Sequence, residues 1–133
     1  MDTMEERLQE CRDGGGIKLD LSWLDISDLG CVREFPNLQV LYVYQTQVND
    51  LSHLKDLVKL KQLYVYQTQV SDLSPLKDLA NLQELYVYRT QVRDLTPLKD
   101  LVNLQELYVS STQVTNFSVL GHLTENGLEI TTK

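Results

Sequence analysis

Leucine recurs along this chain with a fixed period. The repeated leucines are spaced by 22 residues and then once by 21, at Leu19, Leu41, Leu63, Leu85, Leu107 and Leu128. From Leu41 the chain reads LYVYQTQV, and 22 residues later it reads the same eight letters again. Apolar Leu41 and Val43 alternate with Tyr42 and Tyr44, which is the period of a strand with one buried face. Each unit is therefore predicted to open with a short strand.

The second half of each unit has a different pattern, exemplified by DLTPLKDL in residues 94–101. Asp50, Asp72 and Asp94 stand where a carboxylate can cap a short helical turn. Proline suits the first position of such a turn, and Pro75 and Pro97 recur there. The pattern predicts 3₁₀ or single-turn helices between the strands.

One unit of this size cannot bury its leucines alone, whereas stacked units enclose them in a continuous core. The period therefore predicts a single-domain α/β solenoid. We expect five repeats in residues 16–127 and the terminal strand of a partial sixth repeat in residues 128–133.

Residues 1–15 are predicted to form a capping helix over the open end of the core. Asp2 with Glu5, and Thr3 with Glu6, have the spacing of a capping box. Met4, Leu8 and Cys11 fall on one helical face, and the run Gly14-Gly15-Gly16 ends the helix.

The repeated letters resemble the leucine-rich repeat, in its 22-residue class of bacterial internalins and the leucine-rich regulatory subunit of a protein phosphatase. The resemblance lies in Leu82, Leu85, Val87 and Val92, and implies a right-handed superhelix with a parallel concave sheet and 3₁₀ turns on the convex side. The lead-in EERLQECRDGGGIKLDLSWLDISDL is also similar to leucine-rich regions of Roco-type signalling proteins. Threonine replaces the asparagine usual in the family, at Thr46, Thr68, Thr90 and Thr112, and its hydroxyl can still bond the neighbouring backbone.

The net charge and the N-terminal sequence indicate the cellular compartment and the classes of partner to expect. The 12 basic and 19 acidic residues give a net charge of −7. That charge disfavours binding to nucleic acid or to an anionic membrane surface. The charged start MDTMEERLQECRDG lacks the apolar run of a secretory signal, so we expect a cytoplasmic protein.

Residues with reactive side chains form no recognisable catalytic or metal-binding set. Cys11 and Cys31 have no second ligand at metal spacing, and His53 and His122 fall about three strands apart. We expect the carboxylates of the sheet face, which include Glu84 and Glu106, to be scattered without a close pair. We therefore predict no metal, no cofactor and no enzyme activity.

The tyrosines are the residues we expect to bind a partner. Strand alternation places all seven on the exposed face of the sheet, where tyrosine offers large contact area at little cost in side-chain entropy. The predicted site comprises Trp23, Tyr42, Tyr44, Gln45, Tyr64, Tyr66, Gln67, Tyr86, Tyr88, Arg89 and Tyr108. A purely structural ladder of tyrosines is the competing interpretation, because neighbouring rings on stacked strands stabilise one another.

Three functions fit this sequence. The leading hypothesis is a module that binds a protein partner through its tyrosines, as an adaptor, inhibitor or regulatory subunit. The alternatives are a regulatory leucine-rich region of a larger signalling protein and a carbohydrate-binding module. Weak self-association through the exposed tyrosines or the last strand is a further expectation.

Overall fold

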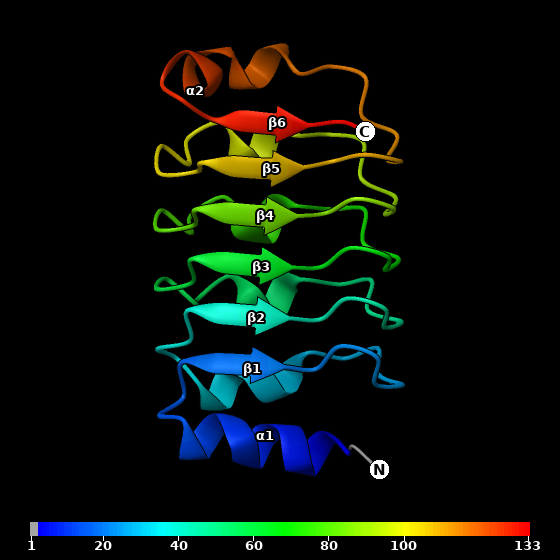
Figure 1. Ribbon diagram of the computed structural model, residues 1–133, viewed down its shortest axis with the longest axis vertical. Helices are drawn as coiled ribbons and strands as arrows, with labels where there is room; N and C mark the ends of the chain where they lie inside the picture. Colours follow the sequence, from blue (N-terminus) through cyan, green and yellow to red (C-terminus); the bar gives the residue numbers. More distant parts are fainter. Residues whose placement is uncertain (1–2) are drawn as a thin grey trace.

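Six short strands form one parallel sheet in the computed structural model, which describes residues 3–133 (Figure 1). The strands are β1 (Lys18–Asp20), β2 (Val40–Tyr42), β3 (Gln62–Tyr64), β4 (Glu84–Tyr86), β5 (Glu106–Tyr108) and β6 (Glu129–Thr131). They pair in sequence order, so each repeat adds one strand to the sheet. The 3₁₀ turns and the connecting segments lie behind the sheet, which leaves its other face open.

The segments that return from one strand to the next each contain a 3₁₀ turn. These turns are η1 (Gly30–Glu34), η2 (Ser52–Leu54), η3 (Ser74–Leu76), η4 (Thr96–Leu98) and η5 (Ser118–Leu120). Asp72 Oδ1 accepts a hydrogen bond from the Ser74 N–H at 2.8 Å, and Asp94 does the same for Thr96 at 2.9 Å. Each aspartate thus accepts a hydrogen bond from the first N–H of its turn, but the predicted capping position was wrong by one residue, because Leu73 and Leu95 are the N-cap residues. The predicted place of proline was one residue early, because Pro75 is the second residue of its turn.

The repeated leucines and valines fill the space between the sheet and the 3₁₀ turns. Leu41, Val43 and Leu54 are each fully buried, and the equivalent residues of the next two repeats are buried in the same way. Tyr42 and Tyr44 lie between these positions on the open face and are half-buried. The alternation predicted from LYVYQTQV is therefore confirmed.

A threonine closes the turn that follows each tyrosine-bearing segment. The Thr68 hydroxyl donates to the Val65 carbonyl at 2.8 Å, and the same bond joins Thr46 to Val43, Thr90 to Val87 and Thr112 to Val109. Thr68 is 3% exposed, so its hydroxyl satisfies a carbonyl that water cannot reach. The expected bond to the neighbouring backbone is confirmed, and it stays within one repeat.

The N-terminal end of the core is covered by helix α1 (Met4–Asp13). The Thr3 hydroxyl accepts from the Glu6 N–H while the Glu6 carboxylate accepts from the Thr3 N–H, which confirms the predicted capping box. Leu8 and Cys11 are buried against the first repeat. The second predicted pair begins at Asp2, which lies outside the described residues.

Glycines end α1 as expected, because Gly15 and Gly16 adopt φ of 87° and 74°. Glycine reaches this left-handed region at no steric cost. The Arg12 guanidinium then ties the helix to η1 through an ion pair with Glu34. The cap is thus held to the first repeat by buried contacts and by charge.

The last strand departs from the predicted register. Ile130, and not Leu128, pairs with Leu107, so the strand enters the sheet later in the sequence than the spacing of the leucines predicts. The last return segment adds helix α2 (Gly121–Glu125) and a left-handed Gly127 with φ of 109°, and these lengthen the connection. Leu128 is still buried, but it precedes the strand.

The architecture confirms the predicted α/β solenoid: a parallel sheet, short 3₁₀ turns and an N-terminal helix. Among residues 3–133, no helix is long and apolar enough to cross a membrane.

Candidate functional site: the tyrosine face

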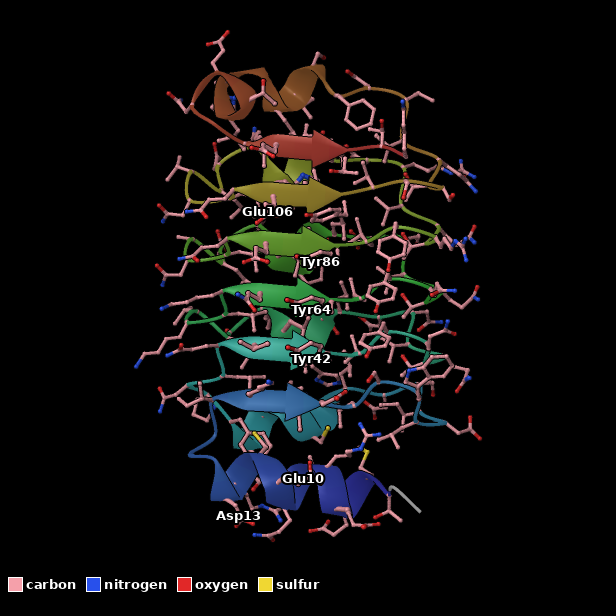
Figure 2. All side chains as sticks on the ribbon, viewed as in Figure 1. Glu10, Asp13, Tyr42, Tyr64, Tyr86 and Glu106 are labelled. Carbon is pink, nitrogen blue, oxygen red and sulfur yellow. The ribbon has the colours of Figure 1, made fainter. Side chains whose placement is uncertain are left out.

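All seven tyrosines of the protein lie on the open face of the sheet. We call this surface the tyrosine face, and its tyrosines form two columns: Tyr42, Tyr64, Tyr86 and Tyr108 in the first, and Tyr44, Tyr66 and Tyr88 in the second. Each tyrosine of the first column is the last residue of one of the strands β2 to β5. Neighbouring tyrosines of this column are paired in register: Tyr42 with Tyr64, Tyr64 with Tyr86, and Tyr86 with Tyr108. Figure 2 shows three of these rings one above another on successive strands.

Within each column the rings stack face to face. Tyr64 and Tyr86 have ring centroids 4.4 Å apart and an interplanar angle of 8°, and Tyr66 and Tyr88 are 4.3 Å apart at 10°. The other neighbours in each column stack at 4.4 to 4.5 Å. The columns touch each other edge to face, through Tyr42 and Tyr44 at 6.3 Å. The tyrosine face is therefore one connected aromatic layer.

This stacking covers both ring faces of Tyr64, Tyr66 and Tyr86, so these residues present mainly ring edges to a partner. A sequence pattern cannot show this, because alternation fixes only the side of the sheet from which a side chain projects. The first column begins beside β1, where Lys18 Nζ lies 5.5 Å from the Tyr42 centroid. At that distance the ammonium group makes a cation–π contact with the ring. Each aromatic column is thus a rigid ridge whose rings support one another.

Three hydroxyl groups of the first column are held by the side chain two residues earlier. Tyr86 donates to Glu84 Oε1 at 2.9 Å, Tyr108 donates to Glu106 Oε1 at 2.6 Å, and Tyr64 contacts Gln62 Oε1 at 3.4 Å. Because residues i and i+2 project from the same face of a strand, the spacing in the sequence could have indicated these pairs. We did not predict them.

Burial and hydrogen bonding raise the pKa of several tyrosines of this face. Burial raises the pKa of Tyr66 and of Tyr86 well above the usual tyrosine value, and the bond to Glu84 adds to the effect on Tyr86. For Tyr108 the bond to Glu106 is the larger cause of its raised pKa. The hydroxyl groups of Tyr66, Tyr86 and Tyr108 are therefore neutral at physiological pH.

The prediction that no two carboxylates on this face lie close together was wrong. Glu84 pairs in register with Glu106, and Glu106 with Glu129, so three carboxylates occupy neighbouring strands. The 22-residue period already places Glu84 and Glu106 at the same position of successive repeats. The shift in register of β6 adds Glu129.

The remaining predicted site residues lie in the turn that follows each strand. Trp23, Gln45, Gln67 and Arg89 share one position there, together with Ser111, and all five have positive φ between 54° and 68°. This left-handed conformation is uncommon outside glycine, and no glycine marked it in the sequence. Trp23 is 68% exposed and meets Tyr44 edge to face at 6.5 Å.

These turn residues border the second tyrosine column without forming a compact cluster. Trp23 and Arg89 are three repeats apart, which is about 14 Å at the usual strand spacing. Gln45 and Gln67 are half-buried between them, and Arg89 is exposed. The structure thus brings the tyrosines together and arranges the other predicted residues along one edge of them.

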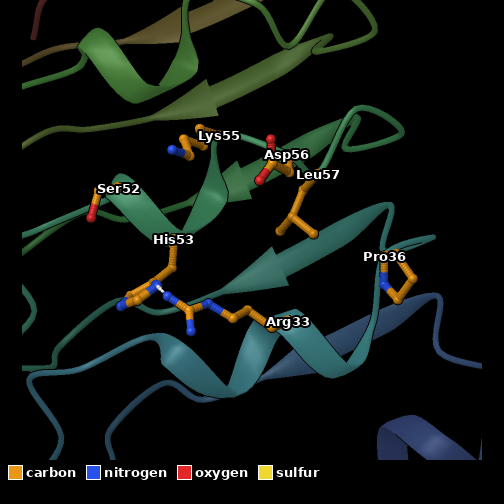
Figure 3. Close-up of a pocket in the computed structure, with 7 residues that line it drawn as sticks. All are labelled: Arg33, Pro36, Ser52, His53, Lys55, Asp56 and Leu57. Atoms are coloured by element: carbon orange, nitrogen blue, oxygen red, sulfur yellow. Dashed lines mark hydrogen bonds between the residues drawn. The ribbon is translucent and has the colours of Figure 1, made fainter.

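A pocket of about 290 Å³ lies on the opposite side of the molecule, between η1 and η2 (Figure 3). Arg33 contacts the His53 ring nitrogen Nδ1 at 3.0 Å, and His53 Nε2 lies 3.3 Å from the Asp28 carboxylate. Because Arg33 and His53 already bond to protein groups, they are poorly placed to hold a ligand. Within residues 3–133, no group of three or more His, Cys, Asp or Glu side chains could hold a metal ion.

Comparisons with known proteins agree with the repeat geometry. A family profile described as leucine-rich repeats (2 copies) matches residues 36–78 and 80–122. No curated protein matches the chain. Leucine-rich repeat proteins generally mediate protein–protein interaction.

Solved structures similar to the chain include an internalin C2 of Listeria monocytogenes, with 33% identity over 88% of this chain and a TM-score of 0.83. An internalin F of the same organism has 26% identity over 97% of the chain and a TM-score of 0.66. A leucine-rich repeat protein of Leptospira interrogans shares the fold, with 17% identity over 86% of the chain and a TM-score of 0.64.

The chain spans 51%, 45% and 36% of the length of these three proteins, respectively. The family match covers residues 36–78 and 80–122, which is more than half of the chain. The chain therefore belongs to the leucine-rich repeat family and is similar to the internalin type of repeat.

Proposed function

We propose that this protein is a non-catalytic module that binds a protein partner through the tyrosine face, in the manner of an adaptor, inhibitor or regulatory subunit. The observation that carries the proposal is the gathering of all seven tyrosines into one open, connected layer. Contiguous exposed aromatic surface is uncommon on a monomer and marks contact sites. Tyrosine, tryptophan and arginine are the residue types that dominate binding energy at protein interfaces.

The ring stacking favours a protein over a carbohydrate as the ligand. A sugar packs its C–H groups against an open aromatic ring face, and inside each column both faces of a ring are covered by neighbours at 4.3 to 4.5 Å. What the columns offer instead is a ridged surface of ring edges and hydroxyl groups. Such a surface suits the apolar and hydrogen-bonding groups of a polypeptide.

Stacking also explains how the surface can bind with little loss of entropy. Each tyrosine is held by its neighbours before any partner arrives, so few rotamers remain to be frozen on binding. The competing structural explanation accounts for the stacking alone. It does not require Trp23, which is 68% exposed at the border of the columns and stabilises no core.

Affinity capture from native lysate tests the proposal. The test variant is Trp23→Ala/Arg89→Ala, which removes two exposed side chains of hot-spot type without opening a column. The control is Val58→Ser/Val102→Ser, which alters two exposed apolar residues of the return segments, 52% and 70% exposed. We expect the captured partner to bind the test variant at least about 30-fold more weakly, equivalent to about 2 kcal/mol, and to bind the control normally. If the partner binds the wild type and the test variant equally, the placement of the binding site on the tyrosine face is refuted.

A further inference from the structure

The open face of the sheet is polarised along its length. The position that precedes the first tyrosine column by two residues is occupied, from β1 to β6, by Lys18, Val40, Gln62, Glu84, Glu106 and Glu129. It is therefore basic on β1, neutral on β2 and β3, and acidic on β4 to β6. The tyrosine face carries three aligned carboxylates along one border, spaced by about 4.8 Å per strand.

These carboxylates are positioned but not neutralised. The Tyr86 and Tyr108 hydroxyls donate to Glu84 and Glu106 and so fix the two carboxylates on the face. Within residues 3–133, none of the three glutamates forms an ion pair with a lysine or arginine of the chain. In the same part of the chain, the only other side chain that donates to them is the amide of Gln62, at 3.1 Å from Glu84 Oε2. Their charge is left for an external cation.

The aligned charges disfavour the isolated fold. Like charges directly opposite on neighbouring strands are destabilising. The solenoid does not need them, because Val40 and Gln62 hold the same position on β2 and β3. A bound cation would relieve the repulsion between these carboxylates.

Resting on the binding role proposed above, we infer that the occupant of the tyrosine face is a protein segment whose lysine or arginine side chains lie over Glu84, Glu106 and Glu129. The cations pair with the carboxylates and not with the rings inside the first column, since both faces of Tyr64 and of Tyr86 are covered by stacking. The rest of the segment packs along the tyrosine columns. The net charge of −7 on the whole chain adds a long-range attraction for the same segment.

The probe for this inference is a library of random peptides displayed on phage and selected on the full chain. Enriched peptides are then measured against two variants with the same change in net charge. The test variant is Glu84→Gln/Glu106→Gln/Glu129→Gln, in which glutamine can still accept the tyrosine hydrogen bonds. The control is Asp56→Asn/Asp78→Asn/Asp100→Asn, which neutralises three exposed carboxylates at equivalent positions of the return segments.

We expect the enriched peptides to carry a surplus of lysine and arginine. They should bind the test variant about 3- to 100-fold more weakly, as expected for three exposed ion pairs, and bind the control as they bind wild type. Neutral or acidic enriched peptides, or an equal loss in both variants, would overturn the inference.

The outcomes also separate this inference from the proposed function. If the peptides bind Trp23→Ala/Arg89→Ala more weakly but bind the glutamine variant normally, the tyrosine face remains the binding surface and the inference of a cationic partner is refuted. Peptides that are indifferent to both variants, or a library that yields no binder, count against both proposals.

Discussion

Removal of one tyrosine ring should cost stability in proportion to the number of rings that it contacts in its column. Tyr64 stacks on Tyr42 at 4.5 Å and on Tyr86 at 4.4 Å, whereas Tyr108 stacks on Tyr86 alone. An aromatic pair contributes about 0.5 to 1.5 kcal/mol beyond the burial of its area. Tyr64→Ala should therefore lower the free energy of unfolding by about 1 to 3 kcal/mol through lost stacking, about twice the effect of Tyr108→Ala.

A double-mutant cycle isolates one stacking contact. In Tyr64→Ala/Tyr86→Ala the contact between the two rings is lost once, but the two single variants each count it. The double variant should therefore be less destabilised than the sum of the singles by about 0.5 to 1.5 kcal/mol. Tyr42 and Tyr108 provide the control pair, since they lie three strands apart on β2 and β5 and share no ring contact.

Urea unfolding, monitored by circular dichroism, measures all of these free energies, with the denaturant dependence checked for each variant. The control pair should be additive to within about 0.5 kcal/mol. A coupling between Tyr64 and Tyr86 no larger than that of the control pair would refute the stacked arrangement, and with it the rigid surface that the binding proposal requires.

Three further predictions concern the turns and the hydroxyl groups. Gln67→Asn should raise the free energy of unfolding by up to about 1 kcal/mol, because asparagine tolerates the left-handed turn. Gln67→Val should lower it by about 1 to 2 kcal/mol, because a β-branched side chain does not. Equal effects of the two substitutions would contradict the turn geometry. Thr68→Val should cost about 1 to 2 kcal/mol because the Val65 carbonyl loses its buried donor, while Thr68→Ser, which keeps the hydroxyl, should cost less; the same urea assay checks both. Burial raises the pKa of Tyr66 and Tyr86 in the folded state. Their protonated side chains therefore contribute fully to the free energy of unfolding below the unfolded-state pKa of about 10, and this contribution is lost as the pH rises above that value. The unfolding free energy should therefore fall above about pH 10, and a Tyr66→Phe/Tyr86→Phe variant should show a shallower fall; an identical pH profile would contradict this.

The 22-residue period was sufficient to predict the sheet, the core and the side of the sheet that carries the tyrosines. Because strand alternation is a property of the backbone, Leu41 and Val43 could be assigned to the core and Tyr42 to the surface without a structure. The period could not show how the rings meet, since stacking depends on side-chain rotamers. It also could not show the left-handed turn at Gln67, where neither glycine nor asparagine marks the conformation.

The C-terminal end shows how a regular pattern can mislead. Leu128 nearly matches the spacing of the other repeated leucines, yet Ile130 enters the sheet, because α2 and Gly127 lengthen the last return segment. The short helix α2 follows the 3₁₀ turn η5 in this segment, and a search for recurring leucines does not detect such an addition. The shift in register places Glu129 beside Glu106, where the proposed cationic partner would lie.

Hydroxyl-radical footprinting of the free and the partner-bound protein tests most directly whether a partner covers the tyrosine face. Because every tyrosine of the chain lies on this one surface, tyrosine oxidation reports on the face without any mutation. Saturating amounts of the captured partner should lower oxidation at Trp23 and at most of the seven tyrosines, and should leave Phe117, in the last return segment, unchanged. Undiminished tyrosine oxidation in a complex that is fully formed would contradict the account.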